Sequence, residues 1–339
     1  MMKYPFISVI FPVEKKTAYL TQALEQYARQ TYRHFEVIIS STRPVPLKHP
    51  FVSVVVNPHF AHDVSSKRNV VLTYASGTIF VFNDDDVYVP PDYLAHVKGV
   101  FANKQIVAAC GPLLTPPDDS FMQKASGAVW ESYLGSFGAG MYRSKVMSRR
   151  TVYDYPAANL VVRADVFKTI NGFTPHLFPG EDTKLCLDIV NTFGKGVTYD
   201  PRLVAYHHRK ALFHDHLRQV GRYGTQRGWF AITYPETSFR IQYFLPAALT
   251  AYILLLPFIF VTNVVNPVYA LVPLIMYGML AAIEGSILAG TYGITIAGIA
   301  TAGIISTHMY YGICFSKSFA GKIVSRVTTF IRLVTKKME

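Results

Sequence analysis

Cysteine is scarce in this chain, and its scarcity excludes one class of fold. The 339 residues contain three cysteines, Cys110, Cys186 and Cys314, which lie far apart in the sequence. A disulfide scaffold or a zinc site needs paired or closely spaced cysteines, and this spacing offers neither. We therefore expect the three thiols to be reduced and buried.

Carboxylates are nearly missing from one long part of the sequence. Between Tyr243 and Phe315 the only acidic residue is Glu284, and the only side chain that can become positive is His308. Because about 20 apolar residues cross a bilayer as a helix, this stretch is long enough for two or three crossings. We predict a transmembrane region at residues 241–316, with apolar helices near residues 243–261, 268–289 and 295–315.

Acidic residues are also too few to balance the basic ones, so the formal net charge is +12. The basic residues gather at His207–Arg227, before the apolar stretch, and at Lys317–Lys337, after it. Basic residues beside membrane spans mark the cytoplasmic side and attract anionic headgroups. We predict a basic amphipathic interfacial segment at residues 206–240, a basic amphipathic tail at residues 317–339, and no nucleic acid partner.

The beginning of the chain lacks the pattern of a signal peptide, because Met1 to Pro5 lead directly into a strand-like run. We therefore expect an integral membrane protein with a cytosolic soluble domain. Three crossings would put the basic tail on the opposite side of the membrane from that domain, whereas the charges favour the cytosol for both. An even number of crossings, with one apolar stretch re-entrant or interfacial, satisfies both expectations.

Strand-like and helix-like patterns alternate in the first part of the chain. We predict strands at residues 6–11, 35–40, 51–56, 78–82 and 107–114, and helices at residues 17–30, 65–74 and 183–192. This alternation indicates an α/β domain, residues 1–205, with a mostly parallel sheet flanked by helices. Residues 115–155 lack periodicity, so we expect loops there, and residues 203–223 have the pattern of an amphipathic interfacial helix.

Three consecutive aspartates, Asp84, Asp85 and Asp86, follow the buried strand-like run at residues 78–82. In open α/β sheets ligands bind at the carboxyl ends of strands. Mg²⁺ and Mn²⁺ bind carboxylate oxygens together with substrate phosphates, so the cluster is a candidate cation site. A solvated turn before the next helix is the alternative interpretation of the same residues.

Five sequence blocks, in this order, resemble family 2 glycosyltransferases of the GT-A (Rossmann-like) fold. They are ISVIFPV, QTYRHFEVII, SSKRNVVLTYASGTIFVFNDDD, AANLVVRADVFKTINGF and GEDTKLCLDIV, and together they extend over about residues 6 to 200. Each block is weak by itself, but five in order are specific. The resemblance implies a hexosyltransferase that takes a sugar from a nucleotide-diphosphate donor with inversion at the anomeric carbon.

The resemblance also assigns the two acidic motifs. It implies that Mn²⁺ or Mg²⁺ is held by Asp84 and Asp86, with Asp86 as the direct ligand and Asp84 or Asp85 nearer the nucleoside. Such a metal stabilises the negative charge of a diphosphate leaving group. In GEDTKL, the resemblance makes Asp182 the base that deprotonates the acceptor, with Glu181 contacting the acceptor or positioning the base. From its position alone, Asp182 could instead be the N-cap of a helix.

Further residues are implied by the same family pattern. Donor contacts fall on a group at the first three motifs: Pro12, Glu14, Ser40, Lys67, Arg68, Asp84 and Asp85. Asn159 and Arg163 match the floor of the acceptor site, and His207 matches a histidine that completes the metal shell or touches the diphosphate. The chain departs from the family at Ser40, where many relatives have an aspartate that binds the nucleobase, so the identity of the base stays open.

Gln219, Arg222 and Tyr223 have a spacing similar to the Q-x-x-R-W signature of membrane-bound processive synthases, with tyrosine in place of tryptophan. This stretch and HMYYGICF at residues 308–315 resemble the succinoglycan-type subgroup, which implies a polyprenyl-diphosphate-linked saccharide as acceptor. Arg218, Arg222 and Arg227 would suit a lipid diphosphate, or could simply attract anionic lipid headgroups. The alternatives are a polyprenyl-phosphate sugar synthase, a processive polysaccharide synthase and a degenerate nucleotide-binding scaffold.

Overall fold

The computed structural model describes residues 4–47, 49–60, 63–138 and 140–338, with side chains up to residue 332. The chain forms two compact units. The first consists of the residues up to Pro116 together with Tyr142–His208, and the second of Pro117–Met141 together with the chain from Arg209 onwards. We expected residues 117–141 to belong to the first domain, residues 1–205, but the structure groups them with the C-terminal helices.

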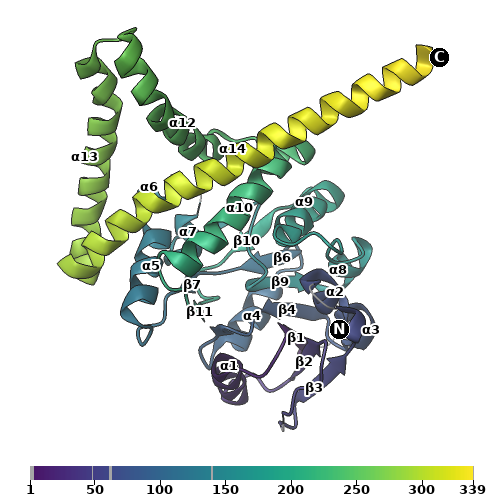
Figure 1. The fold of residues 1–339 in the computed structure, drawn as a ribbon. Helices are drawn as coiled ribbons and strands as arrows, with labels where there is room; N and C mark the ends of the chain where they lie inside the picture. Colours follow the sequence, from purple (N-terminus) through teal and green to yellow (C-terminus); the bar gives the residue numbers. More distant parts are fainter. Residues whose placement is uncertain (1–3, 48, 61–62, 139, 339) are drawn as a thin grey trace. The chain divides into compact units, whose positions relative to one another are not determined.

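The first unit is built on an eight-stranded sheet with the strand order β3-β2-β1-β4-β9-β6-β10-β8 (Figure 1). Its strands are β1 (Ile7–Val13), β2 (Phe35–Ser41), β3 (Val52–Val56), β4 (Ile79–Asn83), β6 (Ala108–Cys110), β8 (Arg150–Val152), β9 (Asn159–Arg163) and β10 (Val197–Tyr199). The pairs β1–β2, β2–β3, β1–β4 and β6–β10 are parallel, whereas β9 runs antiparallel to β4 and β6, and β8 runs antiparallel to β10. The predicted mostly parallel sheet is confirmed.

Both faces of this sheet are covered, which explains why its central strands are mostly apolar. Phe80 and Phe82 of β4 pack on Phe167 and Phe173 at one face. On the other face Phe11 of β1 packs on a tyrosine of the first helix. The helices of this unit are α1 (Ala18–Ala28), α2 (Val64–Asn69), α3 (Val71–Tyr74), α4 (Tyr93–Phe101), α7 (Met141–Ser144), α8 (Ala164–Thr169), α9 (Glu181–Phe193) and the 3₁₀ turn η1 (Pro58–Phe60).

A small three-stranded sheet accompanies the main one. It pairs β5 (Val87–Tyr88) with β11 (Ala205–His207), and β11 with β7 (Leu113–Leu114). This sheet corrects the helix expected over residues 203–223, because residues 205–207 are a strand and the helix begins only at His214. The strand pairing fixes His207 opposite Val87, directly after the aspartates.

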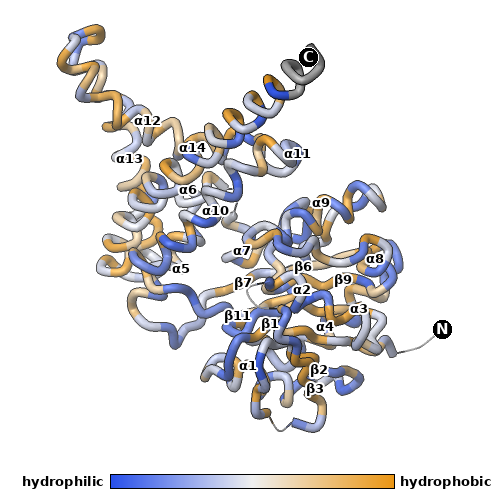
Figure 2. Tube along the Cα trace, turned by 45° about the vertical axis from the view of Figure 1, so that its right-hand side comes forward, coloured by the Kyte–Doolittle hydropathy of each residue, from blue (hydrophilic) through white to orange (hydrophobic). Residues whose placement is uncertain are grey.

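The second unit is helical. It contains α5 (Phe121–Glu131), α6 (Tyr133–Ser136), α10 (His214–Thr233), α11 (Pro235–Ser238), α12 (Ile241–Thr262), α13 (Pro267–Tyr292) and α14 (Ile294–Met338). The loops expected throughout residues 115–155 are therefore wrong for α5, α6 and α7. Of the helices in the described part of the chain, α12 and α13 are long and apolar enough to cross a membrane. Figure 2 shows the apolar residues along both.

Helix α14 is the centre of the second unit, and α5, α6, α10, α12 and α13 all contact it. The contact with α10 is close because glycines face it: a Cβ at Gly228 would lie 2.5 Å from the carbonyl oxygen of Phe315. His216 of α10 lies between the hydroxyl groups of Ser126 and Thr307, at 2.8 and 2.9 Å. Burial and the nearby Arg209 lower the pKa of His216 to about 4, so the ring is neutral at pH 7.

The expected third apolar span and the expected separate tail are parts of one helix. Helix α14 runs through 45 residues without interruption. Ala297, Ala300 and Ile304 of its apolar half are buried against Val129 and Leu134 of the segment 117–141. One face of this half of α14 is therefore covered by protein, whereas Ile294, Ile305 and Ile313 are exposed.

Candidate active site

The three aspartates lie at the carboxyl end of β4, where the sheet reverses its strand order between β1 and β4. Strand β4 ends at Asn83, and the amide of Val87 donates to the carbonyl oxygen of Asp84 at 3.1 Å, which closes a tight turn. The Asp84 side chain is 33% exposed and that of Asp86 is 13% exposed. The cluster therefore forms a tight turn at the edge of the sheet where ligands bind in open α/β folds, and its role as a cation site stays a prediction.

Arg68 of α2 holds Asp84 and Glu181 at the same time. One terminal nitrogen donates to Asp84 Oδ1 and the other to Glu181 Oε1, both at 2.6 Å. The arginine is buried, and its guanidinium lies 5.4 Å from the centre of the Phe173 ring. Charge-assisted hydrogen bonds of this length are strong. Through Arg68, which is predicted to contact the donor, the structure brings the two predicted acidic motifs together.

The second acidic motif begins helix α9. Gly180, with φ of 113°, is the N-cap, and Glu181 and Asp182 are the first two helical residues. The alternative that Asp182 is the N-cap is therefore wrong. Only glycine adopts such a φ without strain, and it turns both carboxylates into the first turn, where the helix dipole favours negative charge.

Burial perturbs both acids of this motif. Burial and the neighbouring Asp182 raise the pKa of Glu181 to about 7, against the opposing effect of Arg68. Burial and the nearby Asp154 also raise the pKa of Asp182. A carboxylate with a raised pKa is a stronger base, and perturbed acids of this kind gather at functional sites.

Asp154 was not identified from the sequence. Its Oδ1 accepts from the hydroxyl of Thr183 at 2.8 Å, and its Oδ2 accepts from Arg143 at 2.9 Å. It acts on Asp182 because the fold brings the two together, 28 residues apart in the chain. No local pattern marks it, since it stands in a stretch without periodicity.

The predicted metal residues Asp86 and His207 are neighbours: Nε2 of the imidazole lies 3.3 Å from Asp86 Oδ1. The pairing of β11 with β5 places them there. Among the described residues no group of three or more His, Cys, Asp or Glu side chains is arranged to hold a metal. A carboxylate and an imidazole nonetheless fit a hard divalent cation whose remaining ligands are water and substrate phosphates.

The predicted donor residues meet at the carboxyl ends of β1 and β2. Pro12 pairs with Ser40 in the parallel register, and Glu14 forms an ion pair with the buried Lys67. Ser40 is fully buried, and its hydroxyl has no hydrogen-bond partner among the described residues. This orphan hydroxyl is at the position where the family resemblance implies an aspartate that binds the nucleobase. Asp85 lies between Asp84 and Asp86 in the same turn and is partly exposed.

Asn159 and Arg163 do not lie together. Asn159 is fully buried and its amide donates to the carbonyl oxygens of Gly111 and Leu203, while its oxygen accepts from Tyr93. Arg163 pairs with Ile79 at the opposite end of β4 from the aspartates. Its guanidinium binds backbone carbonyls of the loop after α4. The structure thus gives both side chains protein partners, and their acceptor roles stay predictions.

Gln219, Arg222 and Tyr223 lie on α10, in the second unit. The amide of Gln219 donates to the Tyr223 hydroxyl at 3.0 Å, and Arg222 is exposed. This one-turn spacing puts the first and last of the three on the same helix face.

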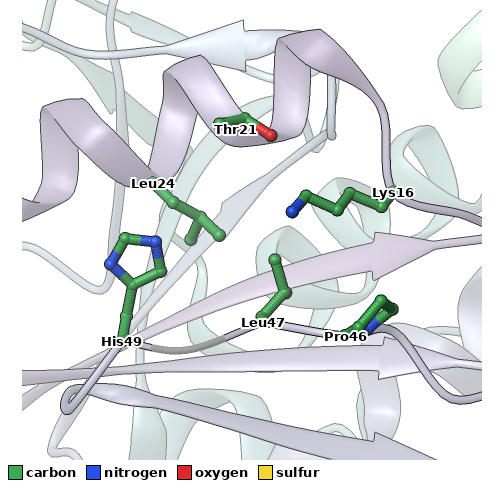
Figure 3. Close-up of a pocket in the computed structure, with 6 residues that line it drawn as sticks. All are labelled: Lys16, Thr21, Leu24, Pro46, Leu47 and His49. Atoms are coloured by element: carbon green, nitrogen blue, oxygen red, sulfur yellow. The ribbon is translucent and has the colours of Figure 1, made fainter.

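A separate small hollow, of about 390 Å³, lies between α1 and the chain after β2 (Figure 3). Lys16 and Thr21 point toward it from the α1 side, while Leu47 and His49 approach from the other. None of the predicted site residues lines it.

Comparison with known proteins finds similar sequences and a similar fold. The model of glycosyl transferase family 2 matches residues 8–170. The pre-mycofactocin glycosyltransferases of two Mycobacterium tuberculosis strains are each 26% identical over 190 residues, which is 56% of this chain. The match extends over only 39% of the length of these relatives.

Among solved structures, the mannosyltransferase PcManGT of Pyrobaculum calidifontis, in complex with GDP-Man and Mn²⁺, is similar in fold. The match has a TM-score of 0.57 at 16% identity, and covers 90% of this chain and 86% of that one. The fold is thus that of GT-A glycosyltransferases. Residues 8–170, a little under half of the chain, are thus similar to family 2 glycosyltransferases.

Proposed function

We propose that this protein is an inverting, metal-dependent glycosyltransferase. It transfers a sugar from a nucleotide-diphosphate donor to a lipid-linked, polyprenyl-diphosphate-bearing saccharide. The observation that carries the proposal is the meeting of the two acidic motifs around Arg68, with Asp84 and Glu181 each 2.6 Å from its guanidinium. A donor site and a proton acceptor must lie side by side for a direct displacement, and this contact joins them.

The chemistry follows from the positions of the acids. The acceptor hydroxyl oxygen bonds to the anomeric carbon as the bond from that carbon to the diphosphate oxygen breaks, and the nucleoside diphosphate leaves. Asp182 takes the hydroxyl proton, and its raised pKa strengthens it as a base. Because one displacement occurs on the face opposite the leaving group, the configuration inverts.

A divalent cation fits at Asp86 and His207, with Asp84 beside them on the donor side. When bound, it supplies positive charge that stabilises the leaving diphosphate. Lys67, Glu14 and Ser40 would meet the nucleoside, at the ends of β1 and β2. The similar mannosyltransferase, which binds GDP-Man and Mn²⁺, supports both the donor class and the cation.

We further propose that α12 and α13 cross the membrane and that α14 does not. The two helices have 22 and 26 residues, and only 17% of the most apolar window of each is buried inside the protein. About 20 residues suffice for a crossing. The apolar half of α14 is instead packed within the second unit, so two crossings return the chain to its starting side. The catalytic unit and the basic tail would then both be cytosolic.

Exposed arginines on α10 support an anionic lipid-linked acceptor. Arg218 and Arg222 are exposed, and guanidinium groups bind diphosphates with paired hydrogen bonds. Attraction of ordinary anionic headgroups is the other outcome, and acceptor assays with neutral and anionic lipids separate the two.

A donor screen tests the central proposal. Detergent-purified protein is given nucleotide sugars with Mn²⁺, Mg²⁺ or EDTA, with and without a membrane lipid extract, and released nucleoside diphosphate is measured. We expect release that needs the cation and rises with the extract. Donor binding without release under every acceptor would contradict the proposal and favour a degenerate site.

Cysteine labelling tests the crossing proposal. Single cysteines at Val264, between α12 and α13, and at Ser325, on α14, are labelled with an impermeant maleimide in intact cells, with Cys314→Ala as background. We expect labelling at position 264 only, and labelling of both after the cells are opened. Labelling of position 325 in intact cells would show that α14 crosses.

A further inference from the structure

The guanidinium of Arg68 is shared by two carboxylates of unequal exposure. The side chains of Arg68 and Glu181 are each 4% exposed, whereas that of Asp84 is 33% exposed. The Glu181 contact is thus sealed from water, while the Asp84 contact opens on the side where the donor is expected. An ion arriving from solvent can reach Asp84 without disturbing Glu181 first.

The buried contact is also incomplete. Nε of Arg68 and Oε2 of Glu181 are both buried and have no hydrogen-bond partner among the described residues. An arginine and a carboxylate can form two parallel hydrogen bonds, but this pair forms one, because the other terminal nitrogen is directed to Asp84. A spare donor and a spare acceptor therefore remain on the same ion pair.

Arg68 holds Asp84, one of the two aspartates that the family resemblance makes metal residues, so Arg68 and a divalent cation would compete for this carboxylate. Asp84 Oδ1, which accepts from Arg68, cannot also bind a cation without weakening its hydrogen bond, and the two positive charges repel each other. Lys67, one residue earlier on α2, is buried to the same extent, but its charge is paired with Glu14. The competition is therefore specific to Arg68.

We propose that Arg68 is a positioning residue that exchanges partners: it holds Asp84 in the metal-free protein and turns to a two-point contact with Glu181 when donor and cation take Asp84. The inference rests on the proposed function. After the exchange the second hydrogen bond from Arg68 favours the charged form of Glu181, and that charge increases the proton affinity of the adjacent Asp182. The base is thereby readied only when a donor is present.

The test measures Mn²⁺ binding without nucleotide, by calorimetry on the full chain in detergent. Arg68→Met should bind Mn²⁺ roughly three- to tenfold more tightly than the natural protein, because a competitor and a like charge are gone. Arg202→Met is the control, because it removes a half-exposed arginine that is paired with Asp200 outside the proposed site, and its Mn²⁺ affinity should stay within about twofold. Equal affinities of Arg68→Met and the natural protein would overturn the proposal, as would Mn²⁺ binding by neither.

Steady-state kinetics provide a second test, because a purely structural role of Arg68 would not change the pH dependence of kcat. Arg68→Met should lower kcat more than it raises the donor KM, and should shift the acid limb of the kcat profile, whereas Arg68→Lys should restore part of kcat. An unshifted acid limb in Arg68→Met would count against the proposal.

If Arg68→Met does not fold, the double variant Arg68→Met/Glu181→Gln replaces it in the Mn²⁺ binding test. Both side chains are then uncharged, so no unpaired charge is buried.

The two proposals fail differently. If no donor is turned over but Arg68→Met gains Mn²⁺ affinity, the proposed function fails and the exchange of Asp84 is supported. If the natural protein is active and the Mn²⁺ affinity of Arg68→Met is unchanged, the exchange fails and the glycosyltransferase stands.

Discussion

The two units of the chain distribute their apolar residues in opposite ways. In the first, Val9, Phe80 and Val81 of the central sheet have no exposed surface. In the second, Leu254 and Val261 of α12 are 69% and 86% exposed, while polar residues such as Glu284, Thr250 and Thr307 are buried. The first unit hides its apolar groups from water. Helices α12 and α13 leave theirs exposed, which agrees with the proposal that these two helices cross a membrane.

Glu284 shows what the inverted arrangement requires. Its carboxylate accepts from the backbone amides of Tyr133 and Leu134, at 3.1 and 3.3 Å, and so satisfies the first amides of α6. A charge in an apolar helix is tolerated because it faces protein. The lone acidic residue of the apolar stretch therefore joins the segment 117–141 to α13.

The largest effect should come from the site of the first unit. Asp182→Asn removes the proposed base and should lower turnover by about 10²–10⁴-fold while donor affinity stays within about threefold. Asp188→Asn, on the same helix but paired with Lys184, is the control. Turnover and donor binding are measured separately. Retained transfer to a simple polyprenyl phosphate would instead favour a polyprenyl-phosphate sugar synthase.

A charge on the exposed face of α12 tests whether that face is in lipid. Leu254→Lys should impair membrane integration, because a lysine near the centre of a span costs about 2.5–3.5 kcal/mol. Tyr74→Lys, at a position of similar exposure in the first unit, should leave membrane integration unchanged. Resistance of each variant to carbonate extraction gives the measurement. Equal extraction of both variants would mean that α12 faces water.

A methyl group on α10 tests the close packing of the second unit. Gly228→Ala should destabilise by about 1–3 kcal/mol, because the new Cβ would meet backbone atoms of α14. Gly278→Ala on α13 meets nothing within 4 Å, and replacing a helical glycine there should stabilise by about 0.5–1 kcal/mol. Thermal unfolding in detergent compares them. Equal Tm values would contradict the α10–α14 contact.

The smallest effect concerns the pH dependence of stability. The pKa of Glu181 is about 7 in the folded chain against an ordinary value of 4.5, so between these values the folded state holds the extra proton. Stability from Glu181 is therefore complete below about pH 4.5 and is lost as the pH rises to about 7, by at most about 1.4 kcal/mol per pH unit. Glu181→Gln should flatten this slope in denaturant titrations. An unchanged slope would assign it to another group.

The elements of the sheet could be predicted because their signals are local. Strands β1, β2 and β4 are mostly apolar, and the Thr17 hydroxyl caps α1 by accepting a hydrogen bond from the amide of Leu20. The antiparallel direction of β9 could not be predicted. A buried strand is apolar on both faces, and this pattern is the same whether the strand runs parallel or antiparallel to its neighbours.

The helices α5 and α6 were missed for a different reason. Their buried residues include Ala125, Ala128 and Val129, small side chains whose partners lie on α14, far along the sequence. A segment with a weak apolar pattern is predicted to be a loop unless the helix against which it packs is known. The continuity of α14 was also missed, because a change from apolar to basic residues marks a change of surroundings rather than the end of a helix.

The residues of the candidate site could be predicted from the sequence, but the contacts between them could not. The sequence singled out Arg68, Asp84, Glu181 and Asp182, and the structure brings the first three into contact. Nothing local indicates that one guanidinium would bind both acids, or that Asp154 would act on Asp182. Such contacts depend on how distant segments meet.

The division of the chain has a practical consequence for anyone wishing to work with the first unit in water. The backbone passes between the units three times, after Pro116, after Met141 and after His208. Stopping translation at His208 would leave α5 and α6 without α14, and uncover Ala128, Val129 and Leu134, which are buried in the whole protein. A soluble version therefore requires a second edit, in which residues 117–141 are replaced by a short polar linker.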